Sequence, residues 1–325
     1  MRKMIRTTII GGAGYTGGEL IRILLNHPDC EIKSVHSRSQ AGRFVYDVHT
    51  DLINETSLVF SDKYELDADI VFLCLGHGES KTFLQKQEIQ DQVRIIDLSE
   101  DFRYADTSDH SFIYGLPEFN RLQIMNAKNV ANPGCFATAI QLALLPLAKE
   151  GLLQEEIHVS AITGSTGAGQ TLTGTSHFTW RSSNISLYKP FVHQHLPEIN
   201  NTLAHIQKKP LPAIYFLPFR GNFTRGILAT VYTKIDDKPE AIKNMFSEYY
   251  KPHPFVGISE SNPDIKQVVN TNKAILYIKK QDDLLLIACV IDNLTKGASG
   301  QAVQNMNLMF GFDETCGLKL KPLGY

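Results

Sequence analysis

The sequence predicts an α/β protein of two domains, one built on a parallel sheet and one on a mixed sheet. The first 135 residues alternate short β-branched runs with helical segments, which is typical of a parallel sheet with crossover helices. Beyond about residue 150 the strand-like runs become longer, as expected of an α+β domain with a mixed or antiparallel sheet. A chain of 325 residues has the length of two ordinary domains, each able to bury its own core.

Apolar runs and their spacing locate the individual elements. Strands are predicted in the first domain at 7–10, 32–36, 70–75, 94–97 and 129–131, and in the second at 157–163, 213–219, 226–235, 274–279 and 284–291. Helices are predicted at 19–26, 136–149 and 300–310, the last of which we expect to pack back on the first domain. The predicted domains are therefore 1–135 plus about 297–325, and about 136–296.

Composition excludes several classes of function. With 20% charged residues and a net charge of -2, the chain has no basic excess with which to bind nucleic acid. It shows neither a signal peptide nor an apolar run approaching the roughly 18 residues of a membrane span, so we expect no membrane and a cytoplasmic location. Its five cysteines are widely spaced and contain no CxxC pair, which predicts reduced thiols and no metal site.

A glycine-rich turn follows the first predicted strand. Residues 11–20 read GGAGYTGGEL and place Gly12, Gly14 and Gly17 in a GxGxxG frame, with Tyr15 and Thr16 between the last two glycines. In this context the glycines allow a tight turn, close approach of backbone to a pyrophosphate, and packing of the helix on the strand. We interpret the turn as the dinucleotide-binding turn of a Rossmann domain, the alternative being a purely structural turn.

The end of the second predicted strand indicates which dinucleotide is bound. NAD-binding folds usually place an acidic residue there to bind the ribose 2′-hydroxyl, whereas this strand ends in Ser37, Arg38 and Ser39. A guanidinium between two hydroxyls suits a 2′-phosphate, which a carboxylate would repel. NADP(H) is therefore the predicted cofactor, unless Arg38 is only an exposed loop residue.

One cysteine has the surroundings of a nucleophile. Residues 132–139 read NPGCFATA and continue as an apolar helix, so Cys135 is predicted at a strand-to-helix turn, where the helix dipole favours the thiolate. Cys74 and Cys289 lie in apolar strand-like runs and are predicted to be inert core residues. Cys30 and Cys316 are assigned to loops or the surface. The alternative for Cys135 is a small residue that fills a tight turn.

A nucleophilic thiol needs a base, and one segment offers it. Residues 192–199 read VHQHLPEI, in which Glu198 follows His195 closely enough to orient its imidazole. His193 is the second candidate. Two histidines this close in sequence are also common at the surface or as hydrogen-bonded core residues, without a catalytic role.

A second glycine-rich segment, GSTGAG at 164–169, follows a predicted strand. We predict that its backbone amides and the hydroxyls of Ser165 and Thr166 face an anion, with a flexible turn as the alternative.

Together these segments resemble a known enzyme family. GGAGYTGGEL, SRSQAG, DLSEDFR, YGLPE, NPGC, HQHLPEI, RGILATVY and DNLTKGASGQAVQNMN occur in the order found in N-acetyl-gamma-glutamyl-phosphate reductases, from Thr8 to about Leu318. The resemblance implies NADPH-dependent reduction of a small-molecule N-acyl-gamma-glutamyl phosphate to the semialdehyde in arginine biosynthesis. It also implies a cysteine thioester, a Rossmann domain completed by the C-terminal helix, and a homo-oligomer, dimer or tetramer.

Site residues follow from the resemblance one by one. Cys135 becomes the nucleophile, His195 its acid/base partner and Glu198 the orienting carboxylate. Expected cofactor contacts are Gly12, Gly14, Tyr15, Thr16, Gly17, Ser37, Arg38, Ser39, Gly167 and Asn293. Expected substrate contacts are Arg103, Asn132 and Ser165.

The sequence departs from the family's pattern near the predicted pocket. Gln170 and Gln194 stand where a basic residue is common, and PFRGNFT at 218–224 replaces a stretch like PHLVPMT, which adds Arg220. This relocated charge suggests an acyl group larger or more acidic than acetyl, such as succinyl.

Three further functions fit part of these motifs. The same nucleophile and cofactor would serve an aminoadipyl or aspartyl phosphate substrate, and an NADP-sensing regulator would keep the glycine turn. A cysteine hydrolase would use Cys135 and His195, but it is disfavoured because hydrolysis needs no dinucleotide.

Overall fold

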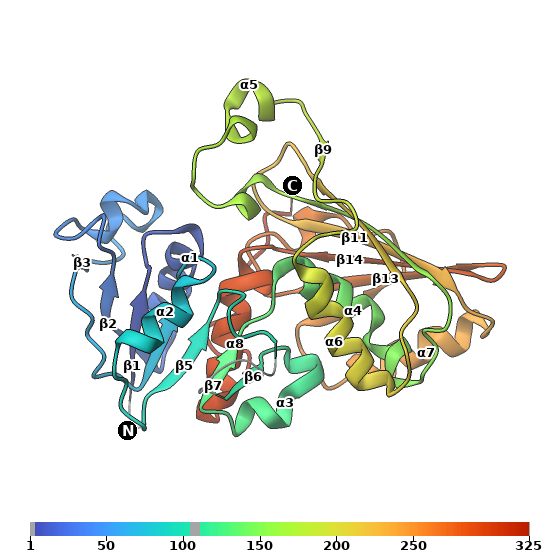
Figure 1. The fold of residues 1–325 in the computed structure, drawn as a ribbon, viewed down its shortest axis with the longest axis horizontal. Coiled ribbons are helices and arrows are strands. Elements are labelled where there is room, and N and C mark those ends of the chain that lie inside the picture. Colours follow the sequence, from blue (N-terminus) through green and yellow to red (C-terminus); the bar gives the residue numbers. More distant parts are fainter. Residues whose placement is uncertain (1–3, 105–110, 325) are drawn as a thin grey trace. The chain divides into compact units, whose positions relative to one another are not determined.

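The computed structural model describes residues 4–104 and 111–324 (Figure 1). The chain forms two compact units. The first comprises the residues up to Gly134 together with Ala298–Leu320, and the second comprises Cys135–Gly297 together with the residues from Lys321 onward.

The first unit is built on a parallel sheet, as predicted. Within the described residues the strand order is β3-β2-β1-β4-β5-β7-β6, and all neighbours run parallel. The strands are β1 Ile5–Ile10, β2 Cys30–His36, β3 Phe60–Ser61, β4 Ile70–Leu73, β5 Arg94–Asp97, β6 Phe112–Tyr114 and β7 Asn129–Ala131. Five of them match the predicted strands. The short strands β3 and β6 were not predicted, because two or three residues are too few to show a period.

Helices α1 (Tyr15–Leu25), α2 (Glu79–Lys86), α3 (Pro117–Met125) and α8 (Gly300–Phe310) complete the first unit, with 3-10 turns η1 (Val45–Asp47) and η2 (Thr50–Leu52). Helix α8 has the predicted bounds and packs against α1 and α3 (Figure 1). Helix α1 begins at Tyr15, four residues before the predicted start. Glycine has a low helix propensity, so the first turn of α1, which contains Gly17 and Gly18, was not predicted. Tertiary packing nevertheless stabilises this turn.

The second unit is built on a mixed sheet with the order β12-β13-β14-β11-β8-β10-β9 within the described residues. The pairs β8/β10 and β12/β13 are parallel and the other pairs antiparallel, which confirms the predicted mixed sheet. The strands are β8 Ile157–Thr163, β9 Ser186–Leu187, β10 Ile214–Arg220, β11 Ile227–Lys234, β12 Val256–Ser259, β13 Ala274–Gln281 and β14 Leu284–Ile291.

One face of this sheet is covered by helices (Figure 1). Helix α4 (Cys135–Lys149) is buried from Phe136 to Ala148 and packs on β11, β14, α6 (His195–Gln207) and α7 (Pro239–Tyr250). Shorter turns are η3 (Ser165–Ala168), η4 (Gly174–Ser176), α5 (Phe178–Arg181), η5 (Ile265–Gln267) and the π-helical turn η6 (Thr295–Ser299). A buried central helix explains why residues 136–148 read as almost continuously apolar.

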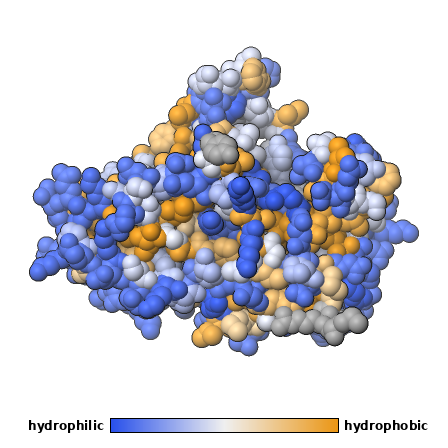
Figure 2. Space-filling view, turned by 180° about the vertical axis from the view of Figure 1, so that it is seen from behind, coloured by the Kyte–Doolittle hydropathy of each residue, from blue (hydrophilic) through white to orange (hydrophobic). Residues whose placement is uncertain are grey.

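The other face of the second unit's sheet carries exposed aromatic side chains. Tyr215 is 38% exposed and Tyr232 37% exposed, and the ring of His158 stacks on Tyr232 with centroids 5.0 Å apart. These residues line a hollow of about 310 Å³ with Phe191, which is 56% exposed. Seen from behind, hydrophobic residues are exposed among hydrophilic ones over the part of the molecule that carries this sheet (Figure 2).

No helix in residues 4–104 and 111–324 is both long and apolar enough to cross a membrane. Over the same residues, no three His, Cys, Asp or Glu side chains are grouped so that they could hold a metal ion.

Candidate active site

The glycine turn of the first unit is packed so closely that side chains are excluded from it. Gly11 has φ +84°, and a Cβ on it would lie 2.4 Å from the carbonyl oxygen of Cys74. A Cβ on Gly12 would lie 2.2 Å from Val35, and one on Gly17 only 2.6 Å from the Cα of Gly12. The third glycine of the motif therefore brings α1 against the turn after β1.

The N-terminus of α1 has the features of an anion site. Gly14 precedes the helix without a side-chain cap, and the first turn contains no acidic residue. A Cβ on Gly14 would meet only the carbonyl oxygen of Gly11, 4.0 Å away, so the backbone is open on this side. The first amides of α1 can thus face a pyrophosphate, and the turn fits a dinucleotide.

The end of β2 presents the predicted cation to solvent. Ser37 is buried, and its amide donates to Ser61 O at 2.9 Å, while its hydroxyl lies 3.5 Å from that of Ser39. Arg38 is exposed and forms no ion pair with any described residue. Burial, together with the charge of Arg38, lowers the pKa of His36. The guanidinium is therefore available to a ligand at this edge.

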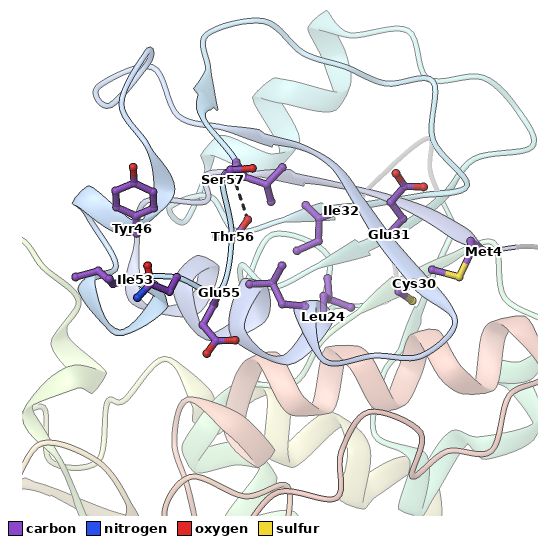
Figure 3. Close-up of a pocket in the computed structure, with 13 residues that line it drawn as sticks. Met4, Leu24, Cys30, Glu31, Ile32, Tyr46, Ile53, Glu55, Thr56 and Ser57 are labelled. Atoms are coloured by element: carbon purple, nitrogen blue, oxygen red, sulfur yellow. Dashed lines mark hydrogen bonds between the residues drawn. The ribbon is translucent and has the colours of Figure 1, made fainter.

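The first unit also has an open hollow of about 880 Å³ (Figure 3). It is lined by the last turn of α1 at Leu24, the amino end of β2 at Cys30 and Ile32, and the segment 53–58. Because β2 runs from Cys30 to His36, this hollow lies at the opposite end of the strand from Arg38. It is not part of the predicted dinucleotide site.

The turn that leads from β7 toward Cys135 is fixed inside the first unit by two predicted substrate residues. Arg103 donates from Nε to Asn132 O at 2.8 Å and from Nη2 to Leu98 O at 3.1 Å. Asn132 donates to Ala298 O at 2.9 Å and accepts from Asn305 at 3.1 Å. Both side chains are buried, so the structure assigns them at least a positioning role for this turn.

Cys135 is the first residue of α4 and is half-buried. The backbone of Gly297 passes so close that a Cβ on it would lie 2.8 Å from that of Cys135. Cys74, predicted in a core strand, lies just after β4 and is half-buried, yet burial raises its pKa and that of Cys30 to about 12, and Cys289 is fully buried. Cys135 thus combines access with a helix N-terminus.

The other two cysteines lie in the first unit. Cys30 was assigned to a loop or the surface, which is wrong: it begins β2 and is only 7% exposed, because Met306 of α8 covers it. Cys316 is half-buried, with its Sγ 3.8 Å from Asp29.

The two predicted histidines lie at the start of α6, next to the first turn of α4. His195 begins α6, and its amide donates to Nδ1 of His193 at 3.2 Å. Their rings lie 4.7 Å apart, and the ring of Phe136 lies 5.4 Å from His193 and 6.2 Å from His195. Since Phe136 directly follows Cys135, the second unit brings the predicted nucleophile and base into one region.

Glu198 lies one turn further along α6. It is only 1% exposed, and its backbone carbonyl accepts from Gln141 of α4 at 3.4 Å. Gln141 also donates to Thr202 at 3.4 Å, which links the two helices.

Sequence reasoning missed Tyr188, which the fold places beside the histidines. Its ring centroid lies 5.7 Å from that of His193 and 4.6 Å from the guanidinium carbon of Arg220. Burial and the neighbouring Cys135 thiolate raise the pKa of Tyr188 to about 12. Nothing in the string SLYKPF predicts this position, because the contact joins the segment after β9 to the end of β10.

Four amides of the GSTGAG segment are not open as predicted, whereas the predicted ligand contact of the Ser165 hydroxyl stays a prediction. The amides of Gly164, Ser165 and Thr166 donate to carbonyls of residues 223–226, and that of Gly167 donates to Gly164. The Thr166 hydroxyl donates to Thr224 O at 2.6 Å. These donors are used to hold the segment in the fold, so they cannot also face an anion.

Asn293 helps to hold the same segment. Its side chain donates to Thr166 Oγ1 at 2.9 Å and accepts from the amide of Gly226 at 2.7 Å. The two glutamines that depart from the family pattern have different environments. Gln170 is exposed, and the side chain of Gln194 accepts a hydrogen bond from Lys189 at 2.9 Å.

A buried ion pair beside Asn293 was also missed. Asp292 is fully buried, and its carboxylate lies 3.0 Å from Nε and 2.9 Å from Nη2 of Arg225. It also accepts from the amides of Leu294, Thr295 and Asn270 at 2.6–3.0 Å. These hydrogen bonds hold the backbone of the turn into η6, which carries Gly297 to Cys135.

We expect His193 to make the protein less stable in acid. Burial, aided by the charges of Lys189 and Arg220, lowers its pKa to about 4, so the folded protein resists a proton that the unfolded chain accepts near pH 6.5. Stability is therefore retained above pH 6.5 and lost as the pH falls toward 4, by about 2 kcal/mol at pH 5 through this residue. The loss of thermal stability between pH 8 and pH 5 should be smaller for His193→Gln than for the wild type. An equal loss in both proteins would contradict the lowered pKa of His193.

The comparisons with known proteins agree with this architecture. The model of the semialdehyde dehydrogenase NAD-binding domain matches residues 6–127, and that of the semialdehyde dehydrogenase dimerisation domain matches residues 135–293. The chain is similar in fold to aspartate semialdehyde dehydrogenase II from Vibrio cholerae (TM-score 0.75, 17% identity, 95% of this chain and 99% of that one). It is also similar in fold to the Candida albicans aspartate semialdehyde dehydrogenase (TM-score 0.69, 13% identity, 95% and 99%). The two domain models together match most of the chain and place it in the class of semialdehyde dehydrogenases, with a first domain of the type that binds a nicotinamide dinucleotide.

Curated relatives show which family within this class the chain belongs to. N-acetyl-gamma-glutamyl-phosphate reductase from Parabacteroides distasonis is 55% identical over 99% of this chain and 100% of its own. The Christiangramia forsetii protein of the same name is also 55% identical, with the same coverage. The chain belongs to the N-acetyl-gamma-glutamyl-phosphate reductase family.

Proposed function

We propose that the protein reduces an N-acyl-gamma-glutamyl phosphate to the N-acyl-glutamate semialdehyde, with NADPH as the reductant, in arginine biosynthesis. The observation that carries the proposal is the half-buried Cys135 at the first residue of α4, in one region with His193, His195 and Tyr188. The residues up to Gly134 with Ala298–Leu320 would bind the cofactor, and the second unit would carry catalysis and oligomerisation. We place the reaction in the cytoplasm, where thiols such as Cys135 are kept reduced.

The chemistry at Cys135 runs in three steps. The thiolate attacks the gamma-acyl carbon, the C–S bond forms, and the C–O bond to phosphate breaks with release of inorganic phosphate. A reduced nicotinamide dinucleotide held at the Gly12–Gly17 turn and Arg38 would supply the hydride that reduces this thioester to a thiohemiacetal on Cys135. Collapse of this adduct breaks the C–S bond and frees the aldehyde and the thiol. His195 takes the thiol proton and later moves the proton of the collapsing adduct, and the first amides of α4 stabilise the oxyanions.

The reverse reaction tests this function directly. Wild-type protein with N-acetyl- or N-succinylglutamate semialdehyde, NADP⁺ and phosphate should form NADPH, with the corresponding acyl phosphate as product. The rate should depend on phosphate, because phosphate must release the acyl group from Cys135. Turnover without phosphate would indicate a hydrolytic aldehyde dehydrogenase, and no turnover at all would contradict the proposal.

We expect Arg38 to select NADP(H) over NAD(H). It is exposed at the end of β2 without an ion-pair partner among the described residues, where a 2′-phosphate would form charge-assisted hydrogen bonds with it. Arg38→Asp should lower the ratio of kcat/KM for NADPH to that for NADH by about 100-fold, since each lost charged hydrogen bond is worth about 1.5–3 kcal/mol. Lys63→Ala, which removes another exposed cation of the same unit, serves as the control. An unchanged ratio in Arg38→Asp would exclude this role.

The oligomer is proposed to be a dimer formed through the outer face of the second unit's sheet. Exposed aromatic residues gather there, including Tyr215, Tyr232 and Phe191. An apolar surface of this kind is typical of a self-association interface. Sedimentation equilibrium should give a dimer that Tyr232→Lys weakens, whereas a tetramer unaffected by this change would contradict the proposal.

A further inference from the structure

Arg220 is the last residue of β10 and points to the catalytic face of the second unit. Residues on one face of a strand recur every second position, and Phe216 and Pro218 of β10 are both buried. The ring of Phe216 packs 5.2 Å from that of Phe136, the residue after Cys135. Arg220 therefore continues the row of side chains that faces the start of α4.

The guanidinium of Arg220 has no anionic partner within residues 4–104 and 111–324. It lies over the ring of Tyr188 at 4.6 Å, and Tyr188 is in turn close enough to Cys135 for the thiolate to raise its pKa. The Nε atom of Arg220 is buried without a hydrogen-bond partner in the same part of the chain. The side chain as a whole is only half-buried, so the guanidinium remains available to an anionic ligand.

Two further cations lie in the same region. Arg181 of α5 donates from Nη1 to the carbonyl of Arg220 at 3.1 Å and from Nη2 to that of Thr175 at 3.2 Å. Lys189 donates to Gln194 at 2.9 Å. Among the described residues none of these cations is paired with a carboxylate, and both Lys189 and Arg220 lower the pKa of His193. The region therefore carries unneutralised positive charge beside Cys135, which favours an anionic ligand.

We propose that Arg220, stacked on Tyr188, binds a carboxylate of the substrate other than the reacting gamma-acyl group. The inference rests on the proposed function. Two carboxylates have this chemistry: the α-carboxylate of the glutamyl unit, and a second carboxylate on the N-acyl group if that group is a dicarboxylic acid such as succinyl. A guanidinium fork matches either one, and the ring of Tyr188 fixes the plane of the fork.

Three semialdehydes distinguish the two carboxylates in the reverse reaction with NADP⁺ and phosphate. They are N-acetyl-, N-succinyl- and N-succinamoyl-glutamate semialdehyde, of which the last has the length of the succinyl compound without its charge. Arg220→Leu should raise KM by about 10- to 100-fold for the substrates that carry the recognised carboxylate, with a smaller change in kcat. A similar rise for all three identifies the α-carboxylate, and a rise confined to the succinyl compound identifies the acyl carboxylate.

Two matched variants separate binding from structural damage. Arg220→Lys keeps the charge and should give KM values between those of wild type and Arg220→Leu, which keeps the test valid if the leucine variant is unstable. Lys243→Leu removes an exposed cation of α7 that pairs with Glu260 and should leave every KM unchanged. An unchanged KM for all three semialdehydes in Arg220→Leu, or a rise only in the KM for phosphate, would overturn the inference. Absence of turnover by the wild type would instead refute the proposed function itself.

Discussion

Cys135→Ser is expected to abolish both directions of the reaction while leaving NADPH binding intact. A serine hydroxyl is a far weaker nucleophile than a thiolate at neutral pH, so neither the thioester nor its reverse can form at a useful rate. Loss of the nucleophile should lower kcat by roughly 10⁴-fold or more. Fluorescence titration with NADPH should be unaffected, because the glycine turn and Arg38 belong to the first unit and Cys135 to the second.

Another cysteine, Cys316, supplies the control for this experiment. Cys316→Ser changes a half-buried thiol of the first unit and should retain full activity. Mass spectrometry of the wild type mixed with acyl phosphate in the absence of NADPH should find the acyl group on the peptide that contains Cys135. Activity retained in Cys135→Ser, or acylation of another residue, would show that the thioester mechanism is wrong.

Local patterns were enough to predict both sheets, their longer strands and helices α1, α4 and α8, but not helices α2, α3, α6 and α7. Strands such as β8 and β14 and helix α8 have the predicted bounds, because each has a long apolar run with a clear period. The short strands β3, β6, β9 and β12 were missed, since two to four residues show no period and pair only because longer strands lie beside them. The early start of α1 was missed for a related reason: contact with Gly12 offsets the poor helix propensity of Gly17.

The sequence could predict those features of the site that depend on neighbouring residues, but not contacts between distant segments. The Gly12–Gly17 turn and the placement of Cys135 follow from neighbours in sequence, as does the close pair His193 and His195. The stacking of Arg220 on Tyr188 joins segments about 30 residues apart, and no pattern within either segment encodes it. The amides of GSTGAG were predicted to be open because their partners at 223–226 lie some 60 residues away.

His195→Gln is expected to lower kcat by about 10²- to 10⁴-fold, the usual contribution of a general acid–base group. The glutamine can fill the space at the start of α6 but cannot take a proton from Cys135. In the wild type, kcat/KM should fall toward acid pH, because histidine is the side chain that ordinarily gains its charge between pH 5 and 8 and a protonated imidazole is no base. His195→Gln should lower activity and move this acid limb to higher pH, because the Cys135 thiol then ionises without a base beside it.

His193 provides the matched comparison for His195, because the two rings lie 4.7 Å apart in the same region. Its pKa is lowered to about 4, so it stays neutral through the assay range and cannot produce the acid limb. His193→Gln removes the acceptor of the His195 amide and should reduce kcat, yet the limb should remain, since the imidazole of His195 is still present. An acid limb that stays in place in His195→Gln and moves in His193→Gln would reverse the assignment of the base.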